Sequence, residues 1–252
     1  MKIAITADVH LTSRKLHPER YHALENILDQ MLQEEITTLI VAGDLFDESS
    51  RNYDEFDTFC KSSKYSKNKF ILIPGNHDVR LNKEFVTAEN VEIITEPTVR
   101  SFESKGLKLF LLPYKPDKSM GEFIAEKSTE LPENDWVLIG HGDWAEGMRE
   151  PNPFEPGVYM PLTRTDMETY KPEKVILGHI HKCLDRDKIH YIGSPCGLDI
   201  TETGRRRFLI LDSKTGRLTP KGIDSDYIYF NESFIILPLK NEKTYVKQQI
   251  AS

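Results

Sequence analysis

Residues that bind metals or transfer protons gather in five short stretches of this sequence. Each stretch follows a short apolar run, and together they supply carboxylates, imidazoles and one amide. The stretches are D-V-H at 8–10, G-D-L-F-D at 43–47, G-N-H-D at 75–78, G-H-G-D at 140–143 and G-H-I-H at 178–181. A donor set of this kind, without thiolates, suits Mn, Fe, Zn or Co better than Mg or Ca. One such histidine is ordinarily a core or surface residue, whereas five repeats of the pattern predict a metal centre.

The apolar runs before these stretches are predicted to be buried β-strands. They cover residues 2–7, 38–42, 70–73, 136–139 and 174–177. Glycine or proline follows most of these runs at once, which is typical of a strand that ends in a turn. In α/β sheets, ligands bind in the crevice at the carboxyl ends of the strands, so the five stretches should converge in space. Asn, Gly and Asp also form ordinary turns, so the G-N-H-D stretch would be ambiguous by itself.

The rest of the chain predicts helices first and hairpins later. Apolar residues at helical spacing predict helices over 18–35 and 53–62, and shorter helical segments near 120–124 and 165–170. Further strands are expected over 91–95, 99–102, 107–112, 188–192, 207–212, 218–223, 227–230 and 234–239. This order predicts an α/β fold in which helices lie outside two stacked sheets. We expect a single domain over 1–252, with a β-rich C-terminal part from about residue 183.

Length and composition exclude several classes of protein. The chain has 252 residues, and no apolar run reaches the roughly 20 residues that span a bilayer. Asp8 interrupts the first apolar stretch, which is unlike a signal peptide, so we expect a cytoplasmic protein without membrane contact. Cys60, Cys183 and Cys196 have no disulfide spacing, and we interpret Cys183 as an idle thiol and not as a ligand. The net charge of −7 argues against a general polyanion binder, although bound cations would offset part of it.

Basic and aromatic residues near the five stretches are candidates for substrate binding. Arg14 follows the first stretch, Lys182 follows the last, and Trp144, which we expect to be exposed, lies in a proline-rich loop over 142–165. A loop of that length inside a domain is usually functional, and its place after a ligand stretch favours the substrate side. Ordinary surface charge is the alternative explanation for Arg14 and Lys182.

In their order, the five stretches resemble the signature of the calcineurin-like metallophosphoesterases. The likeness runs from Asp8 to His181 and implies a four-layer sandwich of two stacked mixed β-sheets flanked by helices. A closer likeness to the SbcD-like DNA repair exonucleases rests on four segments. These are A-D-V-H-L at 7–11, G-D-L-F-D at 43–47, L-G-H-I-H-K at 177–182 and Y-I-G-S-P at 191–195. It implies a metal-dependent phosphodiesterase that cleaves DNA, with Mn as the metal and Fe, Zn or Co as alternatives.

The resemblance implies two divalent ions, with Asp44 as the bridge between them. The other six ligands divide into two sites: Asp8, His10 and His181 in one, and Asn76, His141 and His179 in the other. Two ions about 3.5–4 Å apart neutralise the phosphoryl oxygens of an ester and activate water near neutral pH. His179 and His181 can reach different ions only where the chain bends, because alternate residues of a regular strand share a face.

The resemblance also implies acid catalysis by His77. In the family this histidine lies near the leaving oxygen and stabilises or protonates it. Asp47 matches an aspartate that pairs with the histidine in the family's phosphatases, and a carboxylate partner keeps an imidazole protonated. Capping of the next helix is the alternative role for Asp47, and stabilisation of the loop is the role we expect for Asp78.

Two departures from the family pattern separate its branches. Phosphoprotein phosphatases carry Arg directly after G-D-x-x-D, where this chain has Glu48, which would repel a dianionic monoester. Archaeal and eukaryotic repair nucleases usually carry His at the position of Asp47, so the likeness is closer to the bacterial branch. SbcD-like proteins also have a capping domain and a segment that binds an SbcC-like ATPase. The likeness implies that partner, but we expect this chain to lack both segments.

Three functions remain for this sequence. We expect a phosphodiesterase whose substrate is DNA. The alternative enzyme acts on small nucleotides or other small phosphate esters, which the acidic composition favours. A catalytically inactive scaffold is the third function, but such proteins usually lack a ligand or the acid, and here every one of those positions is filled. The sequence leaves the oligomeric state open.

Overall fold

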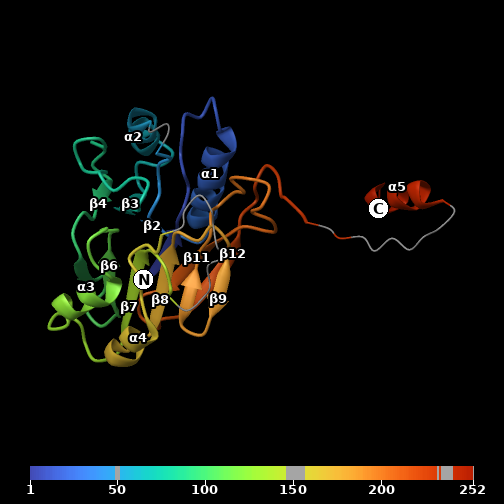
Figure 1. The fold of residues 1–252 in the computed structure, drawn as a ribbon. Helices are drawn as coiled ribbons and strands as arrows, with labels where there is room; N and C mark the ends of the chain where they lie inside the picture. Colours follow the sequence, from blue (N-terminus) through green and yellow to red (C-terminus); the bar gives the residue numbers. More distant parts are fainter. Residues whose placement is uncertain (49–51, 146–156, 232, 234–240, 252) are drawn as a thin grey trace.

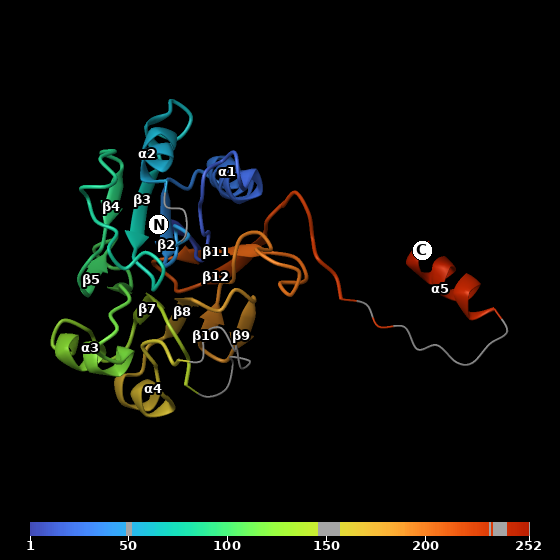
Figure 2. The same ribbon diagram turned by 45° about the horizontal axis from the view of Figure 1, so that its top comes forward.

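Two six-stranded sheets lie face to face, with helices outside both of them (Figure 1 and Figure 2). The structure is a computed structural model of the chain, and it describes residues 1–48, 52–145, 157–231, 233 and 241–251. This arrangement confirms the α/β fold of two mixed sheets flanked by helices.

The first sheet has the strand order β12-β11-β1-β2-β3-β4. Its four strands β1 to β4 are parallel, and Ile40 lies opposite Ile5 on one side and Ile71 on the other. Strands β11 and β12 complete the sheet as antiparallel neighbours. The strands are β1 (Lys2–Thr6), β2 (Thr38–Ala42), β3 (Lys69–Ile73), β4 (Val91–Ile93), β11 (Arg207–Asp212) and β12 (Leu218–Gly222).

The second sheet has the strand order β5-β6-β7-β8-β10-β9. Strands β6, β7, β8 and β10 are parallel, and β5 and β9 form antiparallel edges. The predicted hairpin around Gly106 is the β5–β6 pair. The strands are β5 (Thr98–Ser101), β6 (Lys108–Leu112), β7 (Trp136–His141), β8 (Lys174–Gly178), β9 (Leu184–Arg186) and β10 (Ile189–Tyr191). The β-rich C-terminal part thus contributes strands to both sheets and does not form a layer of its own.

Helices connect the parallel strands and cover the outer faces of the sheets. In Figure 2, α1 and α2 lie against the first sheet, and α3 and α4 lie against the second. The first helix begins at Pro18, whose fixed φ and missing N–H suit a first turn. Capping boxes begin α3 and α4. These four helices are α1 (Pro18–Gln33), α2 (Tyr53–Lys61), α3 (Met120–Lys127) and α4 (Arg164–Tyr170). A fifth helix, α5 (Glu242–Ala251), follows β12, the last of the strands given above, and connects none of them.

The alternation of side chains along the strands produces three apolar layers. In β1, Ile3 and Ile5 face the second sheet, where they pack in one cluster with residues such as Val137. Ala4 faces the other way, into the cluster that α1 and α2 cover. A third cluster lies between the second sheet and its helices, around Trp136. Because both faces of the central strands are buried, their sequences are nearly continuous apolar runs.

Some expected elements differ from the structure. Residues 227–230 do not form a strand, and only an isolated bridge pairs Tyr229 with Thr203. The strand expected over 234–239 lies outside the described residues. Strand β9 and helix α5 were not expected. Among the described residues, no helix has the length and apolar composition to cross a membrane. The single-domain assignment stays a prediction.

Candidate metal centre

The carboxyl ends of five strands from both sheets meet at one place. In the first sheet, β1, β2 and β3 lead into Asp8, Asp44 and Asn76. In the second sheet, β7 ends at His141, and β8 leads into the loop that carries two further histidines. The convergence expected from the sequence is therefore present. The contacts described below connect all seven predicted ligands: Asp8, His10, Asp44, Asn76, His141, His179 and His181.

The first group of donors consists of Asp8, His10 and His181, whose ligand atoms lie within 4.8 Å of one another. The Nε2 atoms of His10 and His181 are 3.2 Å apart. Asp8 is fully buried, and its Oδ1 accepts a 2.9 Å hydrogen bond from the backbone N–H of His179. These three residues come from the end of β1 and from the loop after β8, so the group joins the two sheets.

The second group consists of Asp8, Asp44 and His141, again within 4.8 Å of one another. His141 Nε2 lies 2.8 Å from Asn76 Oδ1, and His179 Nδ1 lies 3.1 Å from the same oxygen. Asn76 and both histidines are thus adjacent, as expected for residues that share one site.

Asp44 lies between the two sets of histidines. Its Oδ2 is 3.7 Å from His10 Nε2 and 3.2 Å from His141 Nε2. Its Oδ1 accepts a 2.9 Å hydrogen bond from the backbone N–H of His77. This is a position from which one carboxylate can contact ions on both sides.

The backbone of the centre is sharply bent. Asp8, His10, Asp44 and His179 all have positive φ, between 49° and 92°. Non-glycine residues rarely adopt this conformation, which costs free energy and is concentrated at functional sites. The bend at His179 is the one that its spacing from His181 requires, because it turns the two imidazoles toward different groups.

Two glycines make room for the ligands. Gly43 has a φ of 92°, and a Cβ there would lie 1.9 Å from His141 Nδ1. A Cβ on Gly75 would lie 2.1 Å from Asp44 Oδ1. Both positions therefore exclude any side chain, which is the physical reason for glycine in the G-D and G-N stretches.

Burial and neighbouring charges shift the pKa values of the centre in different directions. Burial raises the pKa of Asp8 to about 6 and lowers that of His10 to about 3. Burial opposes protonation of His141 and His181, but the nearby carboxylates outweigh it and raise the pKa of each to about 9. Burial also acts against ionisation of Asp44, yet His141 and His10 hold its pKa well below the ordinary range. Divalent cations would displace the protons of the imidazoles and stabilise the ionised carboxylates.

An unpaired oxygen shows that the centre fits a cation. Asp8 Oδ2 is buried and has no hydrogen-bond partner among the described residues. An ionised oxygen left in this way costs free energy, because burial removes its water and nothing replaces it. A divalent ion beside it would provide the missing partner, and His10 and His181 already present nitrogens there. Carboxylates and imidazoles are suitable donors for Mn, Fe, Zn or Co.

The predicted acid lies at the edge of this centre. The ring of His77 is partly exposed, and its centroid lies 4.8 Å from that of His10. Asp47, the predicted partner of His77, lies 3.3 Å from Nη1 of Arg20. Its pairing with His77 stays a prediction. Asp78 stabilises the loop, as expected, because its two oxygens accept the backbone N–H groups of Gly75 and Phe46.

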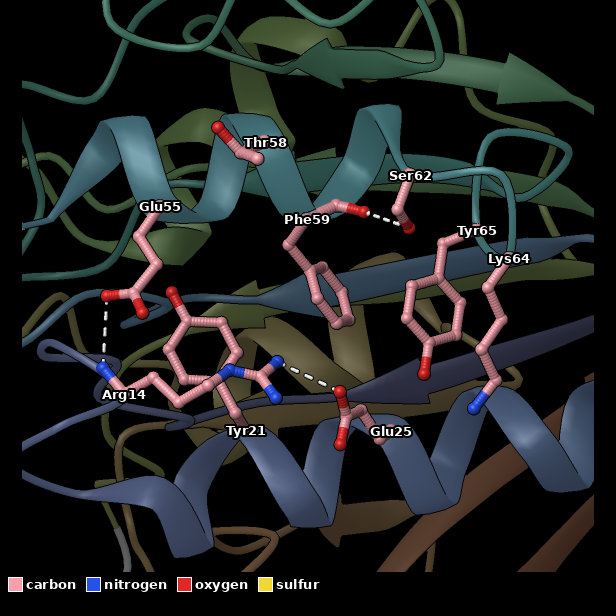
Figure 3. A pocket seen from close by; sticks show the side chains of 9 residues that line it. All are labelled: Arg14, Tyr21, Glu25, Glu55, Thr58, Phe59, Ser62, Lys64 and Tyr65. Carbon is pink, nitrogen blue, oxygen red and sulfur yellow. Dashed lines mark hydrogen bonds and ion pairs between the residues drawn. The ribbon is translucent and has the colours of Figure 1, made fainter.

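Arg14 points into a pocket between α1 and α2 (Figure 3). The pocket has a volume of about 410 Å³, and Arg14 lines it together with Tyr21 and Phe59. The guanidinium donates a 2.9 Å hydrogen bond to Glu25 Oε1, and the backbone N–H donates a 3.0 Å bond to Glu55. In this conformation the charge of Arg14 is already paired, so a substrate would have to compete with Glu25 for it.

The other two candidate substrate-binding residues differ in exposure. Lys182 is exposed beside His181, which is compatible with a contact to substrate. Trp144 was expected to be exposed, but only 8% of its surface is accessible, and its ring packs in the apolar cluster of the second sheet. Most of the loop that follows it, residues 146–156, lies outside the described residues.

Two residues near the ligands carried no signal in the sequence. Arg20 is buried in α1 and donates to the backbone oxygen of His10 and to Asp47. Glu202 accepts a 2.6 Å hydrogen bond from His181 Nδ1. Both lie outside the five stretches, so only the fold brings them to the centre. Asp143, 3.6 Å from His179 Nε2, was within the G-H-G-D stretch but had no assigned role.

Comparisons with known proteins agree with this geometry. The family model described as calcineurin-like phosphoesterase matches residues 1–183. A curated relative from Staphylococcus epidermidis, named as a subunit of the nuclease SbcCD, is 26% identical over 275 residues. The match covers 95% of this chain and 70% of that protein.

Two solved structures share the fold. One is TT1561 of Thermus thermophilus, with a TM-score of 0.54 and 10% identity over 88% of this chain and 98% of that one. The other is GAP50, described as the anchor in the inner membrane complex of Plasmodium. Its TM-score is 0.56, with 11% identity over 100% of this chain and 94% of that one. At such low identity the likeness concerns the fold alone.

Proposed function

Since this chain belongs to the calcineurin-like phosphoesterase family and is a metal-dependent phosphoester hydrolase, we propose that it cleaves phosphodiester bonds and that its substrate is DNA. The observation that carries the nuclease proposal is the extent of the match, because a relative named as a nuclease aligns with 95% of the chain. A role in DNA repair belongs to the same proposal.

We assign the seven ligands to two ions. Asp44 is the proposed bridge, which is supported by its distances of 3.7 and 3.2 Å to His10 and His141. One ion would lie among Asp8, His10 and His181, and the other among Asn76, His141 and His179. Mn is the proposed metal, with Fe, Zn and Co as alternatives that offer the same ligand preferences.

The chain's own residues would then divide the work of hydrolysis. When bound, the ions supply charge that neutralises the phosphoryl oxygens and activates water. Asp8 and Asp44 also accept the backbone N–H groups of His179 and His77, which ties the loops of a proposed ligand and of the proposed acid to the centre. His77, at the partly exposed edge, is the proposed proton donor to the leaving oxygen.

A second candidate function is hydrolysis of small nucleotides or other small phosphate esters. The observation that favours it is the net charge of −7, which disfavours binding of a long polyanion outside the immediate centre.

The ATPase partner implied by the likeness to SbcD also stays a prediction. The name of the Staphylococcus epidermidis relative describes one part of SbcCD, and that description applies to the relative.

A substrate panel tests the proposal. Purified protein loaded with Mn²⁺ would be given single-stranded DNA, cyclic nucleotides, bis(p-nitrophenyl) phosphate and p-nitrophenyl phosphate. We expect turnover of DNA and of the bis ester, and loss of both on chelation. Faster turnover of cyclic nucleotides than of DNA would favour the second candidate. Faster turnover of the monoester than of its diester would contradict the phosphodiesterase proposal and the nuclease proposal with it.

Glu48 provides a specificity test on the same panel. This exposed carboxylate follows Asp47 and would repel a monoester, which carries nearly two negative charges, more than a diester with one. Glu48→Arg should raise kcat/KM for p-nitrophenyl phosphate relative to the bis ester, because a guanidinium pairs with two phosphate oxygens at once. The ratio of the two kcat/KM values is the measurement, and an unchanged ratio would remove Glu48 from the specificity argument.

A further inference from the structure

A carboxylate outside the ligand set holds one of the proposed ligands. Glu202 Oε1 lies 2.6 Å from His181 Nδ1, on the side of the ring that faces away from His10. The opposite nitrogen, Nε2, lies 3.2 Å from His10 Nε2, and His181 forms a group that could hold a metal ion together with Asp8 and His10. The carboxylate therefore accepts the Nδ1–H, and in the neutral ring the lone pair lies on Nε2, which is the tautomer that a metal ligand requires.

Glu202 is itself held rigidly. Its second oxygen, Oε2, accepts a 2.7 Å hydrogen bond from the hydroxyl of Ser194 and a 3.0 Å bond from the backbone N–H of Leu198. Its side chain is 9% exposed. Three donors thus share the two oxygens of one carboxylate, so the side chain has little freedom to turn away from His181.

The same loop also holds the backbone of His181. The buried Arg206 donates a 2.7 Å hydrogen bond from Nη1 to the oxygen of His181, and the N–H of Ser194 donates a 3.1 Å bond to the same oxygen. Arg206 also donates to the backbone oxygen of Glu202 and lies 3.4 Å from its carboxylate. The ring and the backbone of His181 are therefore fixed by one segment, residues 194–206.

We infer that Glu202 is a positioning residue for one of the two ions, the ion held by Asp8, His10 and His181. It fixes the tautomer and the direction of the His181 ring and places a negative charge behind it, which makes the imidazole a better donor. On His141 the outer nitrogen, Nδ1, instead faces the backbone oxygen of Ala42 at 3.1 Å, and the Oδ1 of Asp8 is farther away, at 3.8 Å. The inference rests on the ligand assignment given in the proposed function.

Glu202→Gln is the sharpest variant because it keeps the size and removes the charge. An amide has one acceptor and one donor end, so it cannot satisfy all three partners of Glu202. If its oxygen faces His181, its NH₂ group meets the N–H of Leu198, and if its NH₂ faces His181, the lone pair moves to Nδ1. The matched control is Asp185→Asn, because Asp185 also pairs with a histidine and an arginine, His190 and Arg207, outside the seven-ligand centre.

The experiment is a calorimetric titration of metal-free protein with Mn²⁺. Elemental analysis after dialysis then counts the bound ions per chain. We expect two ions per chain in the wild type and in Asp185→Asn. Glu202→Gln should bind one ion as the wild type does and the other about 10–100-fold more weakly, which is the usual effect of losing an outer partner of a metal-bound histidine. Unchanged affinity for both ions, or equal weakening of both, would overturn the inference.

Two further measurements keep the test decisive. Ser194→Ala leaves every charge in place and removes one bond to Glu202, so it should weaken the same ion by a smaller factor. In wild type loaded with diamagnetic Zn²⁺, ¹⁵N NMR of labelled histidines should show His181 with its proton on Nδ1, and the opposite tautomer would overturn the inference. A wild type that binds neither Mn²⁺ nor Zn²⁺ would instead contradict the ligand assignment, which separates the two failures.

Discussion

At the scale of single residues, the donors of the centre are buried, several have a backbone with positive φ, and hydrogen bonds hold them in place. Asp8 and Asp44 are almost inaccessible to solvent, and each also accepts a backbone N–H. Their positive φ values show that the surrounding structure holds them in a conformation they would not adopt alone. Loss of one donor side chain should therefore lower the affinity for the ions more than it lowers the stability of the fold.

Asp44→Asn should weaken the binding of both ions at once, because it removes the charge that the proposed bridge would share between them. We expect loss of most bound metal and of most activity. Metal per chain, measured by elemental analysis after dialysis, is the readout. The control is Asp117→Asn, at an exposed position outside the proposed ligand set. Two ions per chain with near-normal turnover would refute the bridging role.

His77→Ala should leave the metal content nearly intact and lower kcat by about 10²–10⁴-fold, if proton donation to the leaving oxygen dominates. The loss should shrink for esters with good leaving groups, which need no proton. Single-turnover rates across a series of leaving groups measure this dependence. The control is His22→Ala, since His22 is an exposed histidine paired with Asp226. Equal losses for poor and good leaving groups would argue against acid catalysis.

At the scale of elements, an ion pair links the edges of the two sheets. Glu92 in β4 and Arg100 in β5 share a bidentate contact, one arm of which is 2.9 Å long. Lys69 in β3 lies 3.0 Å from the same carboxylate. The hydrogen bond from Arg100 is the main reason that the pKa of Glu92 falls from 4.5 to about 2. The pair therefore joins β4 of one sheet to β5 of the other.

The stabilisation by Glu92 should depend on pH in a defined direction. Its pKa is lower in the folded protein than in the unfolded chain, so its contribution is complete above pH 4.5 and is lost as the pH falls toward 2. Glu92→Gln should lower the Tm at pH 7, and the difference from the wild type should shrink by about pH 3, inside that window. Thermal unfolding followed by circular dichroism measures it.

The control for this experiment is Glu130→Gln, which breaks the exposed Lys127–Glu130 pair at the end of α3, a pair that does not link the two sheets. It should change the Tm little at either pH. A Tm difference for Glu92→Gln that grows as the pH falls would contradict the sign of the argument.

At the scale of the whole molecule, the residues of the candidate metal centre come from both sheets, so a bound ion would cross-link them. Asp8, Asp44 and Asn76 follow strands of the first sheet, whereas His141 and His179 belong to the second. A binding site made of these residues can form only when both sheets are in place. Metal binding is thus coupled to folding of the entire sandwich.

Mn²⁺ should accordingly raise the Tm of the metal-free protein. A free Mn²⁺ concentration of 100 times the Kd adds about 2.7 kcal/mol to the free energy of unfolding for each ion. For a domain of this size that corresponds to a rise in Tm of roughly 5–10 °C per ion. Differential scanning calorimetry with and without Mn²⁺ checks the shift. Asp44→Asn should show a much smaller one. A Tm that does not respond to Mn²⁺ or to chelation would contradict the cross-link.

The sequence by itself determined where most strands lie along the chain and which donor types follow them. Apolar runs that end in Gly43 or Gly75 and continue with carboxylate, amide or imidazole residues are local features, because they depend on burial and on turns of a few residues. For the same reason the α/β fold of two stacked sheets could be predicted before any contact was known, whereas the assignment of seven ligands came from the resemblance to the metallophosphoesterases and stays a prediction. The expected strand at 227–230 was wrong, since an apolar run of that length says nothing about whether a partner strand is available.

Only the tertiary structure decided how the donors are shared and which residues support them. Glu202 is 21 positions from His181 in the chain, and Arg20 lies on a helix, so neither is marked by a local pattern. Arg14 turns toward Glu25, which helix α1 places beside it, and Trp144 turns into the core, where residues from other strands and helices provide an apolar surface. Side-chain direction, tautomer and pKa all depend on distances between strands and loops, and these distances exist only once the two sheets have packed together.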